Sequence, residues 1–469
     1  MFLEPEAADL ASRVVFDSST ARWWSRLELR QAVEGFASRI CEARGGLTFL
    51  LCRNTAPVLA SYLAAVEAGC AVHLLDARTP PATLAALLDR YRPELVLAPD
   101  DGLLVAGHRQ DGPYLGLTLW WREGERLAPV HPELAVLLGT SGSTGSPKLV
   151  RLSRRSVEAN ADSIVRSLGI DSRECAMASL PISYSYGLSV VNSHLRAGAS
   201  MVLTDETVIS PRFWNLLREQ CCSSLPGVPY TYDLLVRIGF DKLPAPSLRT
   251  LTQAGGRLAT DRAAHFHAEM VRRGGRFFVM YGQTEATARI TCLPSCRLVE
   301  KLGSVGTAIP GGSLRVDFPP GSSRDSVAAG EVVYSGPNVM MGYGESREDL
   351  ARGDELGGHL RTGDLGRLDE DGFLYLIGRS KRIGKVLGMR VNLDDVEVLL
   401  RPHGPAAVIA ADEGLDIYCE YGDAATFANL AGLLARDLRA TPDSFRFHRL
   451  AFLPRTSGGK VDYQVLRRE

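Results

Sequence analysis

Between residues 48 and 98 the chain alternates short apolar runs with amphipathic segments, and this alternation limits its possible folds more than any other feature. The runs LTFLLC, CAVHLLD and ELVLAP predict strands. The segments APVLASYLAAVEAG and PATLAALLDRY between them predict helices. Apolar strands joined by helices indicate a parallel sheet with helices on both faces. The fold class is therefore expected to be α/β.

A second alternating region predicts a second α/β subdomain. Its strands are expected at CAMASLP, SMVLTD, CCSSLPGVP, LRTLTQAGG and RFFVMYG. From about residue 300 short strands and glycine turns follow, which indicates a small β-rich subdomain. The last residues combine a predicted hairpin, AAVIAADEGLDIYCEYGD, with a helix near ATFANLAGLLARDL. We therefore expect a large N-terminal domain over 1–380 and a small α+β C-terminal domain over 381–469.

Charge and composition exclude several classes of partner. The formal charge of the 469 residues is -1, so there is no general electrostatic reason to expect a nucleic acid or an anionic membrane. The first residues carry acids where a signal peptide is basic, and no apolar run is long enough to span a bilayer. The nine cysteines show neither zinc-site spacing nor a disulfide framework. We expect a cytoplasmic protein with reduced thiols.

The stretch LLGTSGSTGSPKLV combines three glycines, several hydroxyl residues and one lysine directly after a predicted strand. Backbone amides in such a loop can turn inward, and hydroxyls add further donors, so the composition suits a phosphate cradle. The spacing is not that of a Walker loop. Open α/β sheets bind ligands at the carboxyl ends of their strands, where this loop is expected. The alternative is a flexible Ser/Gly surface linker.

Four further motifs follow in a fixed order: YGQTEA, GEVVYSGPNVMMGY, RTGDLG running on to GRSKRIGKVLGMRVNLDDVE, and PRTSGGK. Together with the loop, they resemble the adenylate-forming superfamily of acyl-CoA synthetases, peptide-synthetase adenylation domains and luciferases. The resemblance covers nearly the whole chain. It implies an enzyme that binds ATP and Mg²⁺, with a C-terminal domain that is mobile.

The resemblance assigns the nucleotide contacts. In YGQTEA, Tyr281 would stack on adenine beside Gly282, Thr284 would face the α-phosphate and Glu285 would hold Mg²⁺, a cation that prefers carboxylate oxygen. The alternative for Glu285 is an ordinary surface carboxylate. The phosphate loop would hold the β- and γ-phosphates through Thr140, Ser141, Gly142, Ser143, Thr144, Gly145 and Lys148.

The later motifs supply the ribose contact and the catalytic lysine. Asp364 would accept hydrogen bonds from both ribose hydroxyls; otherwise it is a turn residue before a strand. Arg379 resembles a second nucleotide contact, with a linker salt bridge as its rival. Lys460 would offset charge on the α-phosphate during transfer. Lys381 occupies the hinge position, and Gly388 belongs to the loop that would open a channel for a thiol after the domain rotates.

The acid pocket is expected around LPISYSYGLS, which contains no acidic residue to pair with an α-ammonium group. Tyr184 stands where acyl-CoA synthetases often have histidine. These features favour a neutral acyl or aryl acid, although both tyrosines of this segment could instead be core residues. The residues expected to line the pocket are Tyr184, Tyr186, Val228, Tyr230, Ala254, Gly255 and Gly256.

The implied reaction is ATP-dependent activation of a carboxylic acid as an acyl-adenylate, followed by transfer to a thiol. Coenzyme A is the preferred acceptor. Because no carrier domain is present, the alternative is a stand-alone adenylation enzyme that loads the phosphopantetheine of a separate carrier protein. A luciferase-like or non-catalytic member remains a further alternative, as does a nucleotide-binding regulatory module, although Lys460 argues against that module.

Overall fold

The structure is a computed structural model of the chain. Its internal contacts divide the chain into two compact units. The first unit comprises most of residues 1–313 together with residues 335–360, and the second comprises residues 314–334 and 361–469. The structure describes residues 12–99, 105–125, 127–139, 148–318, 329–379, 382–386, 389–411, 414–438, 440–456 and 458–467.

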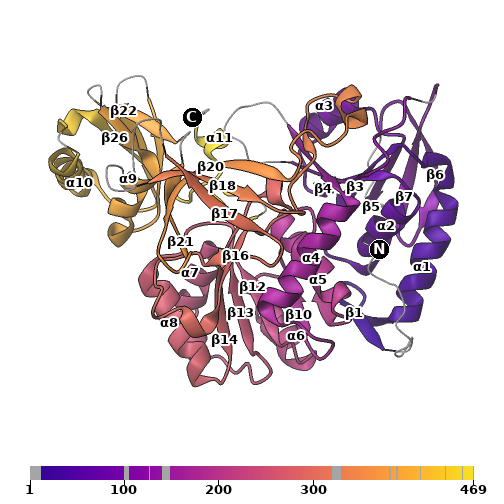
Figure 1. Cartoon of the computed structure of the whole chain (residues 1–469), viewed down its shortest axis with the longest axis horizontal. Helices are drawn as coiled ribbons and strands as arrows, with labels where there is room; N and C mark the ends of the chain where they lie inside the picture. Colours follow the sequence, from indigo (N-terminus) through magenta and orange to yellow (C-terminus); the bar gives the residue numbers. More distant parts are fainter. Residues whose placement is uncertain are drawn as a thin grey trace. The chain divides into compact units, whose positions relative to one another are not determined.

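The first unit contains an eight-stranded sheet with the order β19-β9-β8-β4-β3-β5-β7-β6, of which Figure 1 labels β4, β3, β5, β7 and β6. Strands β4, β3 and β5 are parallel, and all six residues of β3 are buried, because side chains on both faces pack against other elements. This confirms the alternation predicted at residues 48–98. The elements of this region are β3 (Leu47–Cys52), α2 (Ala56–Glu67), β4 (Ala71–Asp76), α3 (Pro81–Tyr91), β5 (Leu95–Pro99), β6 (His108–Tyr114), β7 (Leu117–Arg122), β8 (Leu134–Gly139), β9 (Leu149–Ser153) and β19 (Gly342–Gly344).

A nine-stranded sheet forms the rest of this unit, in the order β16-β15-β14-β13-β12-β10-β11-β1-β2. All five strands predicted for the second α/β subdomain are present in it. The bounds are β1 (Arg13–Asp17), β2 (Arg22–Ser25), α1 (Arg26–Arg39), α4 (Arg154–Leu168), β10 (Cys175–Ala178), α5 (Ser185–Arg196), β11 (Ser200–Leu203), α6 (Pro211–Glu219), β12 (Ser224–Gly227), α7 (Pro229–Arg237), β13 (Thr250–Gln253), α8 (Thr260–Arg272), β14 (Arg276–Tyr281), β15 (Thr291–Leu293) and β16 (Thr307–Ala308).

Helices α4 and α5 lie side by side and share one apolar core with strands of both sheets. Ile164 of α4, Tyr186 of α5, Leu138 of β8 and Met280 of β14 all belong to this core. The core fixes the helices against the sheets, so the loops that leave the carboxyl ends of β12, β13 and β14 have a rigid base. Most of the predicted pocket residues come directly after these strands.

The second unit begins with a four-stranded sheet in the order β17-β18-β20-β21, which confirms the β-rich region predicted after residue 300. The predicted hairpin is β24–β25, and the predicted helix is α10. The boundary expected near residue 380 lies inside this unit and stays a prediction. The bounds are β17 (Ser313–Asp317), β18 (Gly330–Ser335), β20 (His359–Leu368), β21 (Leu374–Arg379), β22 (Ile383–Val386), β23 (Met389–Asn392), α9 (Leu393–Leu400), β24 (Ala406–Ala410), β25 (Leu415–Cys419), α10 (Ala424–Asp437), β26 (Phe445–Arg449) and α11 (Tyr463–Leu466).

Among the residues that the structure describes, no helix has the length and apolarity needed to cross a bilayer. All nine cysteines carry free thiols.

Candidate functional site

The predicted phosphate loop connects β8 to β9, and residues 140–147, which include Thr140, Ser141, Gly142, Ser143, Thr144 and Gly145, lie outside the described residues. The two strands are antiparallel, with Gly139 opposite Leu149, so β8 and β9 pair as a hairpin. Lys148 follows the loop. Its Nζ lies 2.6 Å from a carboxylate oxygen of Glu345 and 5.8 Å from the centre of the Tyr343 ring. These contacts hold the lysine next to the β19 segment.

The YGQTEA motif follows β14 and forms a short 3-10 turn over Thr284–Ala286. The hydroxyl of Tyr343 donates a hydrogen bond of 2.8 Å to Glu285 Oε1. The Met340 amide donates to the Glu285 carbonyl at 2.9 Å. Thr284 Oγ1 donates to Ser185 Oγ at 3.2 Å. Tyr343 therefore contacts both the lysine of the phosphate loop and the carboxylate expected to bind metal.

Two features of this loop explain its residue types. Gly282 is required because a Cβ there would lie 2.0 Å from the Ala288 carbonyl oxygen. Tyr281, the last residue of β14, is only 8% exposed.

Burial raises the pKa of Tyr343, and the negative charge of Glu285 raises it further. The Tyr343 hydroxyl therefore keeps its proton at neutral pH and remains a donor to the carboxylate.

The backbone after the motif is held in an unfavourable conformation by one buried asparagine. Thr287 and Ala288 have φ values of 53° and 90°, in the left-handed region that disfavours residues with a Cβ. The side-chain amide of Asn338 donates to the carbonyls of Ala286 and Arg289, both at 2.8 Å. Thr287 Oγ1 returns a bond of 2.6 Å to the Asn338 carbonyl. Asn338 positions the loop, a role that the sequence analysis missed although the asparagine belongs to a recognised motif.

The described residues contain no group of three or more His, Cys, Asp or Glu side chains arranged to hold a metal. Glu285 is still a suitable single ligand. Its Oε1 accepts from Tyr343, while no hydrogen bond between described residues uses Oε2. A carboxylate oxygen of this kind suits Mg²⁺, which keeps several waters and takes one or two carboxylates together with substrate phosphates.

The structure brings three of the predicted pocket residues together at the start of α5. Gly255 has a φ of 84°, and a Cβ there would lie 2.5 Å from the Tyr184 hydroxyl and 3.2 Å from Val228 Cγ1. Only glycine allows the tyrosine this close. Burial raises the pKa of Tyr184. The three residues form one wall of the expected pocket, in which the Tyr184 hydroxyl packs directly against the backbone of Gly255.

The remaining predicted pocket residues extend this wall. Ala254 is buried, and its amide donates to the Gly227 carbonyl at 3.3 Å. A Cβ at Gly256 would lie 3.1 Å from the Pro229 ring. Tyr230, in the first turn of α7, is partly buried and packs against the large core.

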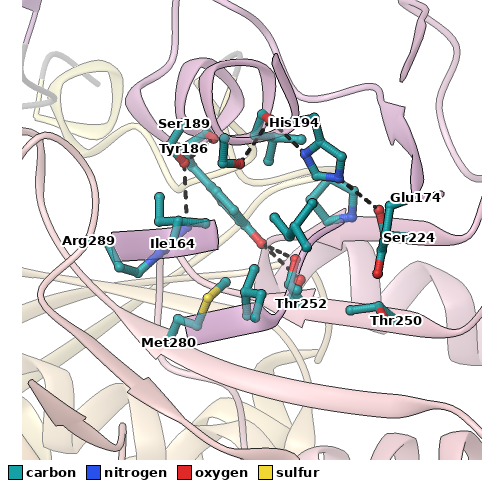
Figure 2. A pocket seen from close by; sticks show the side chains of 15 residues that line it. Ile164, Glu174, Tyr186, Ser189, His194, Ser224, Thr250, Thr252, Met280 and Arg289 are labelled. Atoms are coloured by element: carbon teal, nitrogen blue, oxygen red, sulfur yellow. Dashed lines mark hydrogen bonds between the residues drawn. The ribbon is translucent and has the colours of Figure 1, made fainter. Parts of the chain in front are cut away.

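Tyr186 lies in a different environment from Tyr184, because it lines a cavity between α4, α5 and strands β12, β13 and β14 (Figure 2). Its hydroxyl donates to the Thr252 carbonyl at 2.9 Å and lies 2.8 Å from Thr252 Oγ1. Burial raises its pKa to about 12. The guanidinium of Arg289 lies 4.9 Å from the centre of the Tyr186 ring. Arg289 was not predicted as a site residue, since arginine is rarely buried.

In the second unit the structure brings Asp364 and Arg379 together. They are opposite residues of the β20–β21 pair, and Arg379 Nε lies 3.1 Å from Asp364 Oδ1. Asp364 is buried, whereas the arginine side chain is 58% exposed. Arg379 thus pairs with the other predicted nucleotide contact, across two neighbouring strands, and its contact with the nucleotide stays a prediction.

Lys460 closes a tight turn formed by the PRTSGGK motif. The Thr456 amide donates to the Lys460 carbonyl at 2.8 Å, and the Gly459 amide donates back to the Thr456 carbonyl at 2.9 Å. Gly459 has a φ of 75°, which the turn requires. Arg455 Nη1 donates to the Gly459 carbonyl at 3.2 Å. The lysine is therefore presented from a fixed backbone.

A largely buried ion pair lies beside the expected hinge. Arg382 Nη2 lies 2.7 Å from Glu397 of α9, and its guanidinium stacks 4.1 Å from the centre of the Tyr463 ring. The Tyr463 hydroxyl donates to the same carboxylate at 2.9 Å. The cluster links the segment after the hinge to α11, which begins three residues beyond Lys460. Lys381 and Gly388 themselves lie outside the described residues.

Comparison with known proteins places this geometry in context. A family described as AMP-binding enzyme matches residues 3–344. The sulfoacetate–CoA ligase of Cupriavidus necator is 32% identical over 385 residues, which cover 79% of this chain and 72% of the ligase. The 2-succinylbenzoate–CoA ligase of Bacillus cytotoxicus is 30% identical over 273 residues, 58% of this chain and 55% of the relative. The match thus spans just over half of that relative's length.

Solved structures show the same fold. The O-succinylbenzoate coenzyme A synthetase of Bacillus subtilis, in complex with ATP and magnesium ion, superimposes with a TM-score of 0.77 at 21% identity, and 99% of each chain is covered. ATP-bound MatB from Rhodopseudomonas palustris gives a TM-score of 0.75 at 22% identity, over 99% of this chain and 97% of that one. The α/β class, with a large N-terminal and a small C-terminal part, is confirmed.

Proposed function

Because the chain belongs to the family of AMP-binding enzymes, we propose that it activates a carboxylic acid with ATP and transfers the acyl group to a thiol. A carboxylate oxygen attacks the α-phosphate, which forms an acyl-adenylate and releases pyrophosphate. The thiol sulfur then attacks the carbonyl carbon, and AMP leaves with the oxygen that came from the acid. Coenzyme A is the preferred thiol, since the matched sulfoacetate and 2-succinylbenzoate enzymes are named as CoA ligases.

One observation carries this proposal. Three segments far apart in sequence meet at the carboxyl end of β14: Lys148 from the loop hairpin, Glu285 from the turn and Tyr343 from β19. Carboxyl ends of parallel strands are where α/β sheets bind nucleotides. A magnesium triphosphate needs a cation near its phosphates, which Lys148 would supply, and a carboxylate oxygen for the metal, which Glu285 would supply. The Tyr343 hydroxyl would hold that carboxylate in place.

The chain's own residues then divide the work of the first step. Glu285 would hold Mg²⁺, which neutralises phosphate charge when bound. Thr284 would donate to the α-phosphate, and the loop from Thr140 to Lys148 would hold the outer phosphates. Such preorganised donors stabilise charge that develops during transfer.

The second unit would supply the remaining groups. Asp364, buried and already bonded to Arg379, would accept both ribose hydroxyls. Lys460 would lower the barrier to adenylation by offsetting charge on the α-phosphate. We further propose that rotation at Lys381 replaces Lys460 by the loop at Gly388, which opens the way for the thiol.

We propose a cytoplasmic location, because all nine cysteines are free thiols, as expected in a reducing compartment. In this setting a carboxylic acid, ATP and coenzyme A are the small-molecule partners.

The test is ATP–pyrophosphate exchange across a panel of carboxylic acids, followed by addition of coenzyme A or a phosphopantetheinyl carrier protein. We expect exchange that depends on the acid and on Mg²⁺, and a thioester when coenzyme A is added. Thioester on the carrier protein alone would move the acceptor to that partner. Exchange with free α-amino acids, and none with acids that lack the amine, would contradict the proposal.

A further inference from the structure

The cavity lined by Tyr186 contains a positive charge that the protein itself does not neutralise. Arg289 is only 2% exposed, and no ion pair among the described residues includes it. Its Nη2 lies 3.4 Å from Ser189 Oγ, and its Nε and Nη1 have no hydrogen-bond partner among the described residues. A buried guanidinium normally uses its donors on carboxylates or carbonyls, because the desolvated charge is otherwise costly.

The other ionisable groups of the cavity do not supply the missing negative charge (Figure 2). Glu174 also lines it, but its carboxylate accepts from Ser223 at 3.2 Å and lies 3.5 Å from Arg276. His194 is buried, its Nδ1 bonds the Val190 carbonyl at 2.8 Å, and burial lowers its pKa to about 4. His194 is therefore neutral at pH 7, and Arg289 remains the unbalanced charge.

A second buried arginine shows what full pairing looks like in this chain. Arg151 has no exposed side-chain area, and it forms an ion pair with Glu355. Its nitrogens also donate to the carbonyls of Tyr343 and Met341, both at 3.2 Å. Arg289 has no comparable set, although it is almost equally buried. The difference indicates that part of the partner set of Arg289 comes from outside the protein.

We propose that the acid activated by this enzyme carries a second anionic group, a carboxylate or a sulfonate, and that Arg289 binds it through Nε and Nη1. Two donors of one guanidinium match the two oxygens of such a group. Arg289 lies four residues after Glu285 in the loop that Asn338 holds. The loop that places the proposed Mg²⁺ ligand therefore also places the arginine in the cavity. The inference rests on the proposed function, and it replaces the neutral acid expected from LPISYSYGLS.

The first experiment compares acids that differ only in the second charge. Malonate, succinate and glutarate are paired with their monoamides, and 3-sulfopropionate tests the sulfonate. We expect kcat/KM for exchange to be roughly 10–100-fold higher for at least one dianion than for its monoamide, the size of a charge-assisted pair. Arg289→Met should remove this preference mainly through KM, while the KM for ATP stays within about threefold. Arg289→Lys should restore part of it.

The second measurement is thermal unfolding, which distinguishes a ligand-binding arginine from a structural one. Arg289→Met removes an unpaired buried charge, so its midpoint should equal or exceed that of the wild type. Arg151→Met, the matched control, breaks a complete set of partners and should unfold at a lower temperature. A large loss of stability in Arg289→Met, with unchanged acid preference, would show that Arg289 only packs against Tyr186.

Binding without turnover separates this inference from the proposed function. Thermal midpoints are measured with each acid, with and without a non-hydrolysable ATP analogue and Mg²⁺. Stabilisation by a dianion that disappears in Arg289→Met supports the inference even if no acid supports exchange. Exchange with monocarboxylic acids that is indifferent to Arg289→Met overturns the inference and leaves the function intact. Absence of both binding and exchange for every acid refutes both.

Discussion

Asn338 offers the sharpest test of how the loop after β14 is held. The change is Asn338→Ala, which removes the two hydrogen bonds from its amide to the carbonyls of Ala286 and Arg289, both 2.8 Å long. A buried carbonyl left without a donor costs about 1–3 kcal/mol. Asn160 still approaches the Arg289 carbonyl at 3.5 Å, so the two losses should total about 2–4 kcal/mol of unfolding free energy.

The change should also lower the activity of the protein that remains folded. Thr287 and Ala288 are held at positive φ, a conformation that residues with a Cβ rarely adopt, so the loop should leave it once the two hydrogen bonds are gone. Glu285 would then move, and exchange should fall at least tenfold in protein that is still folded. Denaturant unfolding and exchange kinetics measure both quantities.

The control is Asn192→Ala, which removes a buried amide whose Nδ2 donates to the Tyr62 hydroxyl at 3.3 Å. It should leave exchange within about twofold, since its amide bonds the Tyr62 hydroxyl and not a carbonyl of the loop. If Asn338→Ala unfolds and exchanges like the wild type, the loop is not held in the way described.

Three further outcomes are expected. Tyr343→Phe deletes the donor to Glu285, the carboxylate proposed to bind Mg²⁺, but keeps the ring, so kcat/KM for MgATP should fall roughly 10–150-fold in protein whose thermal unfolding shows that it is still folded. Burial lowers the pKa values of His73 and His194 to about 4, so both stay neutral in the folded protein while the unfolded chain takes up protons below about pH 6.5. The unfolding free energy should therefore be highest above about pH 6.5 and fall toward pH 4 by about 1.4 kcal/mol per pH unit for each histidine. His194→Gln should halve this pH dependence, measured by denaturant titrations at pH 7 and pH 5. Lys460→Ala should abolish adenylation yet still convert supplied acyl-adenylate to thioester, whereas Gly388→Trp should show the reverse pattern, and equal loss of both steps in folded Lys460→Ala would contradict the division between two poses.

The strands of the first unit could be predicted because their burial leaves a direct trace in the sequence. β3 is buried at every position and almost entirely apolar, and each helix beside it carries apolar residues at helical spacing. The glycines were equally informative where a Cβ would collide, as at Gly255 beside Tyr184 and at Gly282 beside Ala288. In these places a local rule and the tertiary structure demand the same residue.

Arg289 and Asn338 could not be recognised in the same way, because their roles depend on partners brought together only by the fold. Asn338 lies about fifty residues beyond the loop that it holds. Arginine is usually exposed, so a buried arginine without an ion pair contradicts the ordinary expectation. The only local trace is its place in the buried stretch from Thr287 to Thr291. The hinge at Lys381 and the channel at Gly388 stay predictions.

The most direct test of the account follows the oxygen atoms of the acid. An acid with both carboxylate oxygens labelled with ¹⁸O is incubated with the enzyme, ATP, Mg²⁺ and coenzyme A, and the products are analysed by mass spectrometry. Attack on the α-phosphate predicts one ¹⁸O in AMP and unlabelled pyrophosphate. Label in inorganic phosphate with formation of ADP, or AMP without label, would contradict the proposed acyl-adenylate.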